Sequence, residues 1–172
     1  MKLFIAVNLP REIKDYLFDF QKEFRSLGKF NFVPKKNYHV TLKFLGEIKE
    51  DKLDYIKQKL SNVNFKSFST SLYKLGYFDY RVLWISSNPK EDVLELAKKV
   101  DEQLIEYPND HEFNNHITIA RIKSLKDKEE FEKRLNIEVK KLKFRVTSFE
   151  LMRSKSSKDG SRYTILETYS LQ

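Results

Sequence analysis

Residues 38–46 read YHVTLKFLG, and residues 115–122 read NHITIARI. Both stretches alternate polar and apolar residues, which predicts β-strands with one buried face. Both also contain the same pattern, His-φ-Thr-φ, in which φ is an apolar residue. The two histidines, His39 and His116, lie 77 residues apart (116 − 39). A pattern that recurs in this way predicts an internal repeat, and a repeat constrains the whole fold.

The segments around the two motifs support this repeat, because they follow the same order of strand, helix, strand, helix and strand. Pro10 lies 29 residues before His39, and Pro89 lies 27 residues before His116, each in the first turn of an expected helix. The expected elements of the first copy are 2–8, 9–24, 38–46, 50–60 and 65–78, and those of the second copy are 81–87, 88–107, 115–122, 126–135 and 139–152. A last strand at 161–171 is expected to pair with 149–153 across a loop that contains Gly160.

This order predicts an α+β fold with two lobes related by a pseudo-two-fold axis. Each lobe would have an antiparallel sheet with outer helices, and a central cleft would lie between the lobes. We expect one domain over 1–172, with lobes built mainly from about 1–78 and 79–172 and with room for exchanged strands. A chain of 172 residues is long enough to bury such a core without disulfides or metals.

Composition limits the class of protein further. The chain has no cysteine, which excludes disulfides and thiolate chemistry, and it has no apolar stretch long enough for a membrane span. We therefore expect a cytoplasmic protein, a monomer, without contact to a membrane. The net charge of +8 is compatible with nucleic acid as a partner, although a basic composition alone is often only a solvated surface.

The strand faces indicate where the chemistry lies. Alternate residues of a strand share a face, so His39, Thr41 and Lys43 should point one way, and His116 and Thr118 should do the same in the second copy. A single histidine in a strand is usually a structural residue. Two His–Thr pairs at matching repeat positions instead favour one site, with both pairs facing each other across the cleft.

Two histidines and two threonines suit acid–base catalysis at a phosphorus atom. Imidazole titrates near pH 6.5, so one ring can be neutral and accept a proton while the other is charged and donates one. In-line phosphoryl transfer needs these groups on opposite sides of the phosphorus. The threonine hydroxyls can bind the non-bridging oxygens, and Lys43 would add a positive charge.

A metal or a nucleotide cofactor is not expected. The third histidine, His111, lies five residues before His116, and strand parity puts it on the other face, so a three-histidine metal site is disfavoured. The chain also lacks the glycine-rich loops that bind nucleotide cofactors. Any nucleotide is then a substrate held by side chains.

At the level of families, HVTL (39–42) and HITI (116–119) resemble the signature of the 2H phosphoesterase superfamily. LFIAVNLP, YHVTLKFLGEI, LGYFDYRVLWI and HITIAR occur in the order of its RNA 2′,3′-cyclic phosphodiesterase branch, historically called 2′–5′ RNA ligase. The resemblance implies metal-independent hydrolysis of a terminal 2′,3′-cyclic phosphate on RNA to a 2′-phosphomonoester. It also implies substrates that are RNA ends or cyclic-phosphate nucleotides.

The resemblance further assigns roles to residues, which the spacing alone does not. His39 would be the proton donor, His116 the proton acceptor, and Thr41 and Thr118 would bind phosphate. Arg121 matches the arginine that closes the family's second motif and would bind the substrate phosphate, although a regular strand would point it away from His116. Asn115 departs from the family, which usually has proline there.

Two alternative functions and the aromatic residues stay open at this stage. The chain could be a 2′–5′ RNA ligase or nuclease, or a non-catalytic RNA-binding module. Aromatic residues make up 14% of the chain, and stacking on RNA bases is a possible use for some of them. Candidates in or near expected cleft loops are Phe30, Tyr38, Tyr77, Phe78, Phe113 and Tyr163, whereas Trp84 is expected in the core.

Overall fold

The structure, a computed structural model, describes all residues from 1 to 172 and has an α+β fold. Its helices are α1 (Arg11–Phe20), α2 (Leu53–Leu60), α3 (Glu91–Gln103) and α4 (Lys128–Arg134). Its strands are β1 (Lys2–Asn8), β2 (Gly28–Phe32), β3 (His39–Glu47), β4 (Phe68–Phe78), β5 (Val82–Asn88), β6 (Ile117–Leu125), β7 (Lys143–Val146), β8 (Ser148–Ser157) and β9 (Gly160–Ser170). A short 3₁₀-helix, η3 (Lys35–Asn37), comes directly before β3.

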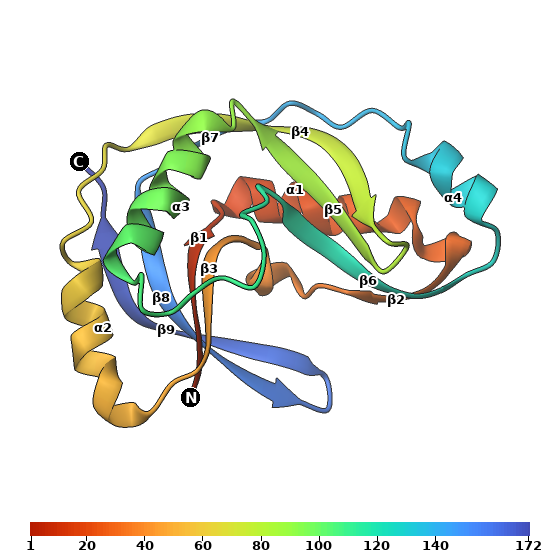
Figure 1. The fold of residues 1–172 in the computed structure, drawn as a ribbon. Helices are drawn as coiled ribbons and strands as arrows, with labels where there is room; N and C mark the ends of the chain where they lie inside the picture. Colours follow the sequence, from red (N-terminus) through yellow and green to blue (C-terminus); the bar gives the residue numbers. More distant parts are fainter.

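The nine strands form one curled sheet, which has two halves joined at a narrow connection (Figure 1). One half contains β7, β4, β5 and β6, with β2 paired to β6, and the other contains β3, β1, β8 and β9. The halves meet where β3 pairs with β6 through a single residue pair, Val40 with Ile117. The rest of this edge of β6 is occupied by β2, which leaves no room for a longer ladder with β3.

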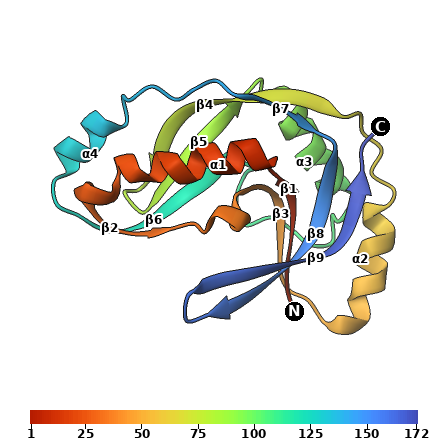
Figure 2. The ribbon, with the colours of Figure 1, turned by 180° about the vertical axis from the view of Figure 1, so that it is seen from behind.

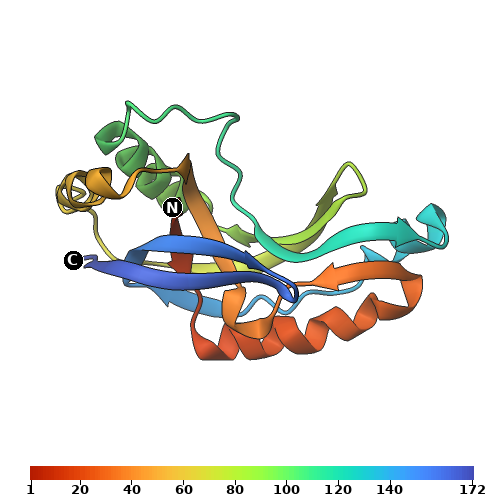
Figure 3. The same ribbon diagram turned by 90° about the horizontal axis from the view of Figure 1, so that it is seen from below.

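The helices cover the two halves from opposite sides. Figure 2 shows α1 lying across the half that contains β4, β5 and β6. Figure 3 shows α2 and α3 on the other side of the strands from α1. Each half of the sheet therefore keeps one face that no helix covers. None of the four helices combines the length and the apolar composition needed to cross a bilayer.

Of the 44 buried residues, 35 form one large core that runs through both halves, and Phe4, Ala6 and Met152 form a small second cluster. In α1, the residues that helical spacing predicts to be buried, Ile13 and Leu17, are indeed inside. Each fully buried aliphatic side chain of this kind contributes about 1.5–3 kcal/mol to the free energy of folding. Pro10 stands at the N-cap of α1 and Pro89 lies just before α3, so both prolines precede the first turn instead of lying in it.

Two predictions about strands are wrong. The stretch 139–152, expected as one strand, bends at Thr147 into β7 and β8, which pair with β4 and β1 in different halves of the sheet. The apolar residues change phase at this point, from 142, 144 and 146 to 149 and 151, but no glycine or proline marks the bend. Strand β2 was missed, because GKFNF is short and begins with a glycine.

The predicted C-terminal hairpin is confirmed, with a tighter turn than expected. Strands β8 and β9 pair from Ser148 with Ser170 to Ser157 with Gly160, so only Lys158 and Asp159 form the turn. Gly160 has a φ of +109°, a value that L side chains rarely adopt. β8 pairs with β1 only as far as Ser154. The end of the hairpin therefore projects beyond the sheet (Figure 1).

Candidate active site

The bridge between β3 and β6 brings the two His–Thr pairs onto one face of the sheet. In an antiparallel pair, residues that lie opposite each other share a face. Because Val40 pairs with Ile117, His39 lies across from Thr118, and Thr41 lies across from His116. The paired residues occupy the same position in their two motifs, so the bridge relates the motifs by a local two-fold axis.

The two motifs also share a β-bulge, which changes the strand faces beyond the threonines. Residues 39–44 and residues 116–121 have the same burial pattern. In each stretch the first and third residues are half-buried, the second, fourth and fifth are buried, and the sixth is exposed. In β3 the pairing with β1 skips Leu42, and in β6 the pairing with β5 skips Ile119. An extra residue of this kind turns the following side chains to the other face.

The bulge corrects the predicted position of Lys43. This residue does not share the face of His39 but points toward α3, and its side chain is fully buried. Its Nζ donates hydrogen bonds to Asp101 Oδ1 at 2.6 Å and to Asn109 Oδ1 at 3.0 Å. Lys43 therefore fastens the end of α3 and the loop that leads to His116, and the structure does not bring it together with the histidines.

The same bulge brings Arg121 to the site. The side chain of Arg121 is exposed on the face of Thr118. Burial raises the pKa of the Tyr163 hydroxyl, and the positive charge of Arg121 opposes this effect. The Tyr163 ring in turn contacts His39. In β3 the matching position is occupied by Phe44, which is 58% exposed. Sequence reasoning missed Phe44, although the motif alignment would have found it once the bulge was known. An exposed ring beside a phosphate-type site offers a surface on which a base can stack.

Each histidine is held by the carbonyl group two residues before it. His39 Nδ1 lies 2.6 Å from Asn37 O, and His116 Nδ1 lies 3.0 Å from Asn114 O. A carbonyl oxygen only accepts, so Nδ1 carries the hydrogen in both rings, and Nε2 is the free nitrogen that can take up a proton. Thr41 Oγ1 lies 2.8 Å from His39 Nε2 and donates to it.

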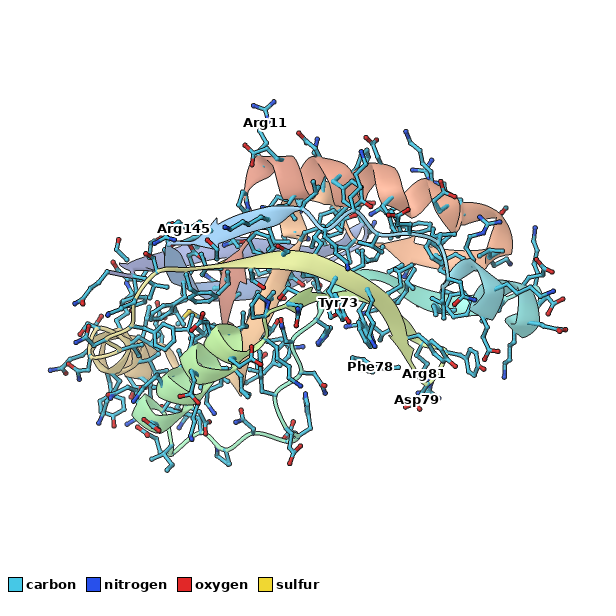
Figure 4. The ribbon with its side chains drawn as sticks, turned by 90° about the horizontal axis from the view of Figure 1, so that it is seen from above. Arg11, Tyr73, Phe78, Asp79, Arg81 and Arg145 are labelled. Atoms are coloured by element: carbon cyan, nitrogen blue, oxygen red, sulfur yellow. The ribbon has the colours of Figure 1, made fainter.

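Aromatic rings pack against both histidines. The Tyr163 ring stands nearly perpendicular to His39, with centroids 5.4 Å apart, and Phe4 lies 5.3 Å away. The Phe78 ring stands in the same way on His116 at 5.1 Å. Phe78 lies at the end of the β4–β5 hairpin, next to the turn at Asp79 (Figure 4). These contacts fix the orientation of both imidazoles.

The environment lowers the pKa of both histidines below the ordinary value. Burial is the main cause for the lowered pKa of His39; the bond to Asn37 O opposes it, and the nearby positive charge of His116 adds to it. Burial also lowers the pKa of His116, against the bond to Asn114 O and together with the charge of His111. Both rings are therefore neutral near pH 7 when the site holds no anion.

Three further residues singled out in the sequence, His111, Asn115 and Trp84, lie around His116. His111 is exposed in the loop before β6, and its charge contributes to the lowered pKa of His116. Asn115, which stands where the family usually has proline, is tied to β5, because its Nδ2 donates to Ser87 O at 3.1 Å and to Ser87 Oγ at 3.0 Å. Trp84 is half-buried and contacts His116, so its expected place in the core is wrong.

The aromatic candidates divide into two groups. Tyr163 and Phe78 contact the histidines. Tyr38 is fully buried in the core, its hydroxyl accepts a hydrogen bond from Gln21, and burial raises the pKa of that hydroxyl. Phe30 stacks on Phe32 within the missed strand β2. The remaining two, Tyr77 and Phe113, pack against the core cluster.

This face therefore carries two imidazoles whose Nε2 atoms can accept a proton, two threonine hydroxyls and an arginine. No group of three or more His, Cys, Asp or Glu side chains is placed to hold a metal ion. Paired bases with hydroxyl and guanidinium donors on the same face are typical of a phosphoesterase of the two-histidine class.

Comparison with known proteins agrees with this class. The family model described as LigT-like phosphoesterase matches the chain twice, over residues 7–84 and 83–163. The chain is 29% identical to an RNA 2′,3′-cyclic phosphodiesterase of Methanocaldococcus jannaschii, covering 98% of this chain and 100% of the relative. It is 32% identical to one of Thermus thermophilus, covering 100% and 91%. The crystal structure of the Thermus thermophilus protein TT0787 has a TM-score of 0.84, with 30% identity over 99% of this chain and 97% of that chain. The chain belongs to the LigT-like phosphoesterase family of the 2H superfamily.

Proposed function

We propose that the protein hydrolyses the terminal 2′,3′-cyclic phosphodiester of RNA to a 2′-phosphomonoester, with His39 and His116 as acid and base and without a metal. The observation that carries the proposal is the Val40–Ile117 bridge, which sets the two His–Thr pairs on one face in a two-fold arrangement. The curated relatives in Methanocaldococcus and Thermus carry the name of this activity.

The reaction needs one proton to be removed and one to be supplied. Water attacks phosphorus, and the base takes its proton as the P–O bond forms. The bond from phosphorus to the 3′-oxygen breaks, and the acid gives a proton to that oxygen, which becomes a free 3′-hydroxyl. By family resemblance, His39 Nε2 supplies the proton and His116 Nε2 accepts the proton of water. The two-fold arrangement supports an acid and a base on opposite sides of the phosphorus, whereas the choice of His39 as the acid rests on the family resemblance alone.

The hydroxyls and the arginine hold the charge of the phosphate. Thr41 and Thr118 donate to the non-bridging oxygens, and Arg121 adds a guanidinium on the same face. Thr41 Oγ1, which donates to His39 Nε2 in the free site, turns to the phosphate when substrate binds. His39 Nε2 is then released to carry the proton that it donates.

The lowered pKa values are compatible with this division of roles. An anionic phosphodiester between the rings favours the charged form of a nearby imidazole and raises its pKa. One ring then binds a proton while the other, which stays neutral, acts as the base. The rate should therefore pass through a maximum with pH, because it falls when the base is protonated and also when the acid is deprotonated.

The decisive experiment uses a short RNA that ends in a 2′,3′-cyclic phosphate, with a chelator present. The expected product is the 2′-phosphate and not the 3′-phosphate. His39→Ala and His116→Ala should each lower kcat by roughly 10²–10⁴-fold. His111→Ala, which removes the exposed third histidine, is the matched control and should retain turnover.

Three outcomes would contradict the proposal in different ways. Loss of turnover with the chelator, restored by added metal, would reject the metal-free mechanism. No turnover by folded protein would reject this substrate, and RNA with 2′–5′ linkages would be tested next. Retention of the biological activity by His39→Ala would favour a non-catalytic RNA-binding module.

A further inference from the structure

The end of the β8–β9 hairpin has features that the fold itself does not need. Beyond Ser154 the hairpin has no neighbouring strand, so residues 155–162 form a two-stranded arm that extends past the edge of the sheet. All of these residues are exposed. They bury no apolar side chain, and a lone two-stranded ribbon is at best marginally stable in water. The arm therefore adds little to the stability of the protein.

The charges of the arm oppose its own folding. Lys155 lies directly across from Arg162, and like charges at such a position destabilise a strand pair. Lys158 stands at the turn, and Asp159 is the only acidic residue of the arm. None of the three basic side chains takes part in an ion pair. An arrangement that costs stability and lacks acidic partners is suited to an external polyanion.

The arm is fixed beside the active site. Asn37 Nδ2 donates to Ser161 O at 2.9 Å and ties the arm to η3. The same Asn37 accepts from His39 Nδ1 through its backbone oxygen, and its side chain is buried. Tyr163, the first residue of β9 after the arm, contacts the His39 ring. Lys36, exposed in η3 and free of ion pairs, adds a fourth positive charge next to the arm.

We infer that this arm, together with Lys36, binds the backbone phosphates of a single-stranded RNA whose cyclic end lies in the active site. The inference rests on the proposed function and names its substrate class, an oligonucleotide and not a mononucleotide. Four residues of strand span roughly 13 Å, which exceeds the spacing between neighbouring phosphates of a nucleic acid strand. The serine hydroxyls of the arm can donate to phosphate oxygens as well.

The first test is binding that requires no catalysis. Fluorescence anisotropy of a labelled single-stranded RNA with a plain 3′-hydroxyl is measured for the wild type, for Lys155→Gln/Arg162→Gln and for Lys90→Gln/Lys98→Gln. The control loses the same charge from exposed positions at the start and on the surface of α3. The arm variant should bind about tenfold more weakly, and its log–log salt slope should be smaller by about 1.4, or about 0.7 for each lost contact.

The second test is turnover of two cyclic phosphates. The arm variant should lose about tenfold in kcat/KM for a cyclic-ended oligonucleotide and nothing for a nucleoside 2′,3′-cyclic phosphate. Its Tm should be equal to or higher than that of the wild type, since a repulsive pair is gone. A lower Tm with equal losses on both substrates would mean general damage and would overturn the inference.

The two proposals fail separately. If no cyclic phosphate is hydrolysed but the arm variant loses RNA binding, the proposed activity is wrong and the arm remains an RNA-binding surface. If cyclic phosphates are hydrolysed but the arm variant binds and cleaves oligonucleotides like the wild type, the arm is not used. Equal losses in the α3 control, or equally tight binding of duplex RNA, would also overturn it.

Discussion

The His39 motif and the His116 motif occupy equivalent places and have become different in detail. Both have the same burial pattern, the same bulge and the same bond from Nδ1 to a carbonyl two residues before. After the bulge, however, β3 carries Phe44 where β6 carries Arg121. His39 Nε2 is also bound by a threonine, whereas no hydrogen bond is made to His116 Nε2. The backbone thus repeats the geometry, and single side chains make the two motifs chemically different.

The largest effect should come from removing either histidine of this pair, and the double variant tests whether the two act together. If the two rings act in one concerted proton transfer, His39→Ala/His116→Ala should be about as slow as either single variant, because the second loss removes nothing further. Single-turnover rates on a cyclic-ended RNA measure this. Losses that multiply would show that the histidines act independently.

The residues after the two bulges allow the comparison to be sharpened. Arg121→Ala should lower kcat/KM by roughly 100-fold, since it removes a charge from the phosphate site. Phe44→Ala should raise KM by about tenfold for substrates with a base, in line with the strength of base stacking, and should leave ribose 2′,3′-cyclic phosphate unaffected. Equal effects of Phe44→Ala on both substrates would show that Phe44 only packs against the site.

A third difference between the motifs lies on the opposite face of the sheet from the histidines. There Lys43 of the first motif occupies the position that Ala120 occupies in the second. Lys43→Met should reduce the free energy of unfolding by about 1–3 kcal/mol, because two bonds to a charged group are lost. The Lys43 side chain is far enough from the reacting face that kcat should fall by less than about tenfold, the equivalent of about 1.4 kcal/mol. Denaturant unfolding and steady-state rates test this pair of effects, with Asp101→Asn, which keeps an acceptor, as the milder control.

The smallest expected effect concerns pH and stability. Both histidines have a pKa below the ordinary value in the folded protein, so the unfolded chain binds more protons between the two values. Stability is then greater above about pH 6.5 and falls as the pH drops below it. His39→Gln should flatten this fall relative to the wild type, as followed by Tm between about pH 5 and pH 8. A Tm that rises on acidification would contradict the burial argument.

That the two motifs lie in one site could be predicted from the sequence because it depends on local alternation and on a repeat, but their direct pairing within one sheet, instead of across a cleft, was not predicted. His39, Thr41, His116 and Thr118 share a face as expected. The positions of Lys43 and Arg121 could not be predicted in this way, since a bulge depends on the register with a neighbouring strand.

Long-range contacts were equally hidden from the sequence. Tyr163 is 124 residues beyond His39 (163 − 39), and only the path of β9 explains why its ring stands on the imidazole. Phe4 reaches the same ring because β1 pairs with β3. Such contacts follow from strand order, which alternation along a single strand does not specify.

The single pair between Val40 and Ile117 has a mechanical consequence. A ladder of many bonds would lock the spacing of the two imidazoles, but one pair acts as a pivot. The separation of the two imidazoles then depends on how α1, α3 and the common core pack between and against the two halves of the sheet. Catalytic rate should accordingly respond to repacking of interior leucines that never approach a substrate, and selection for speed would act on the interior as much as on the reacting face.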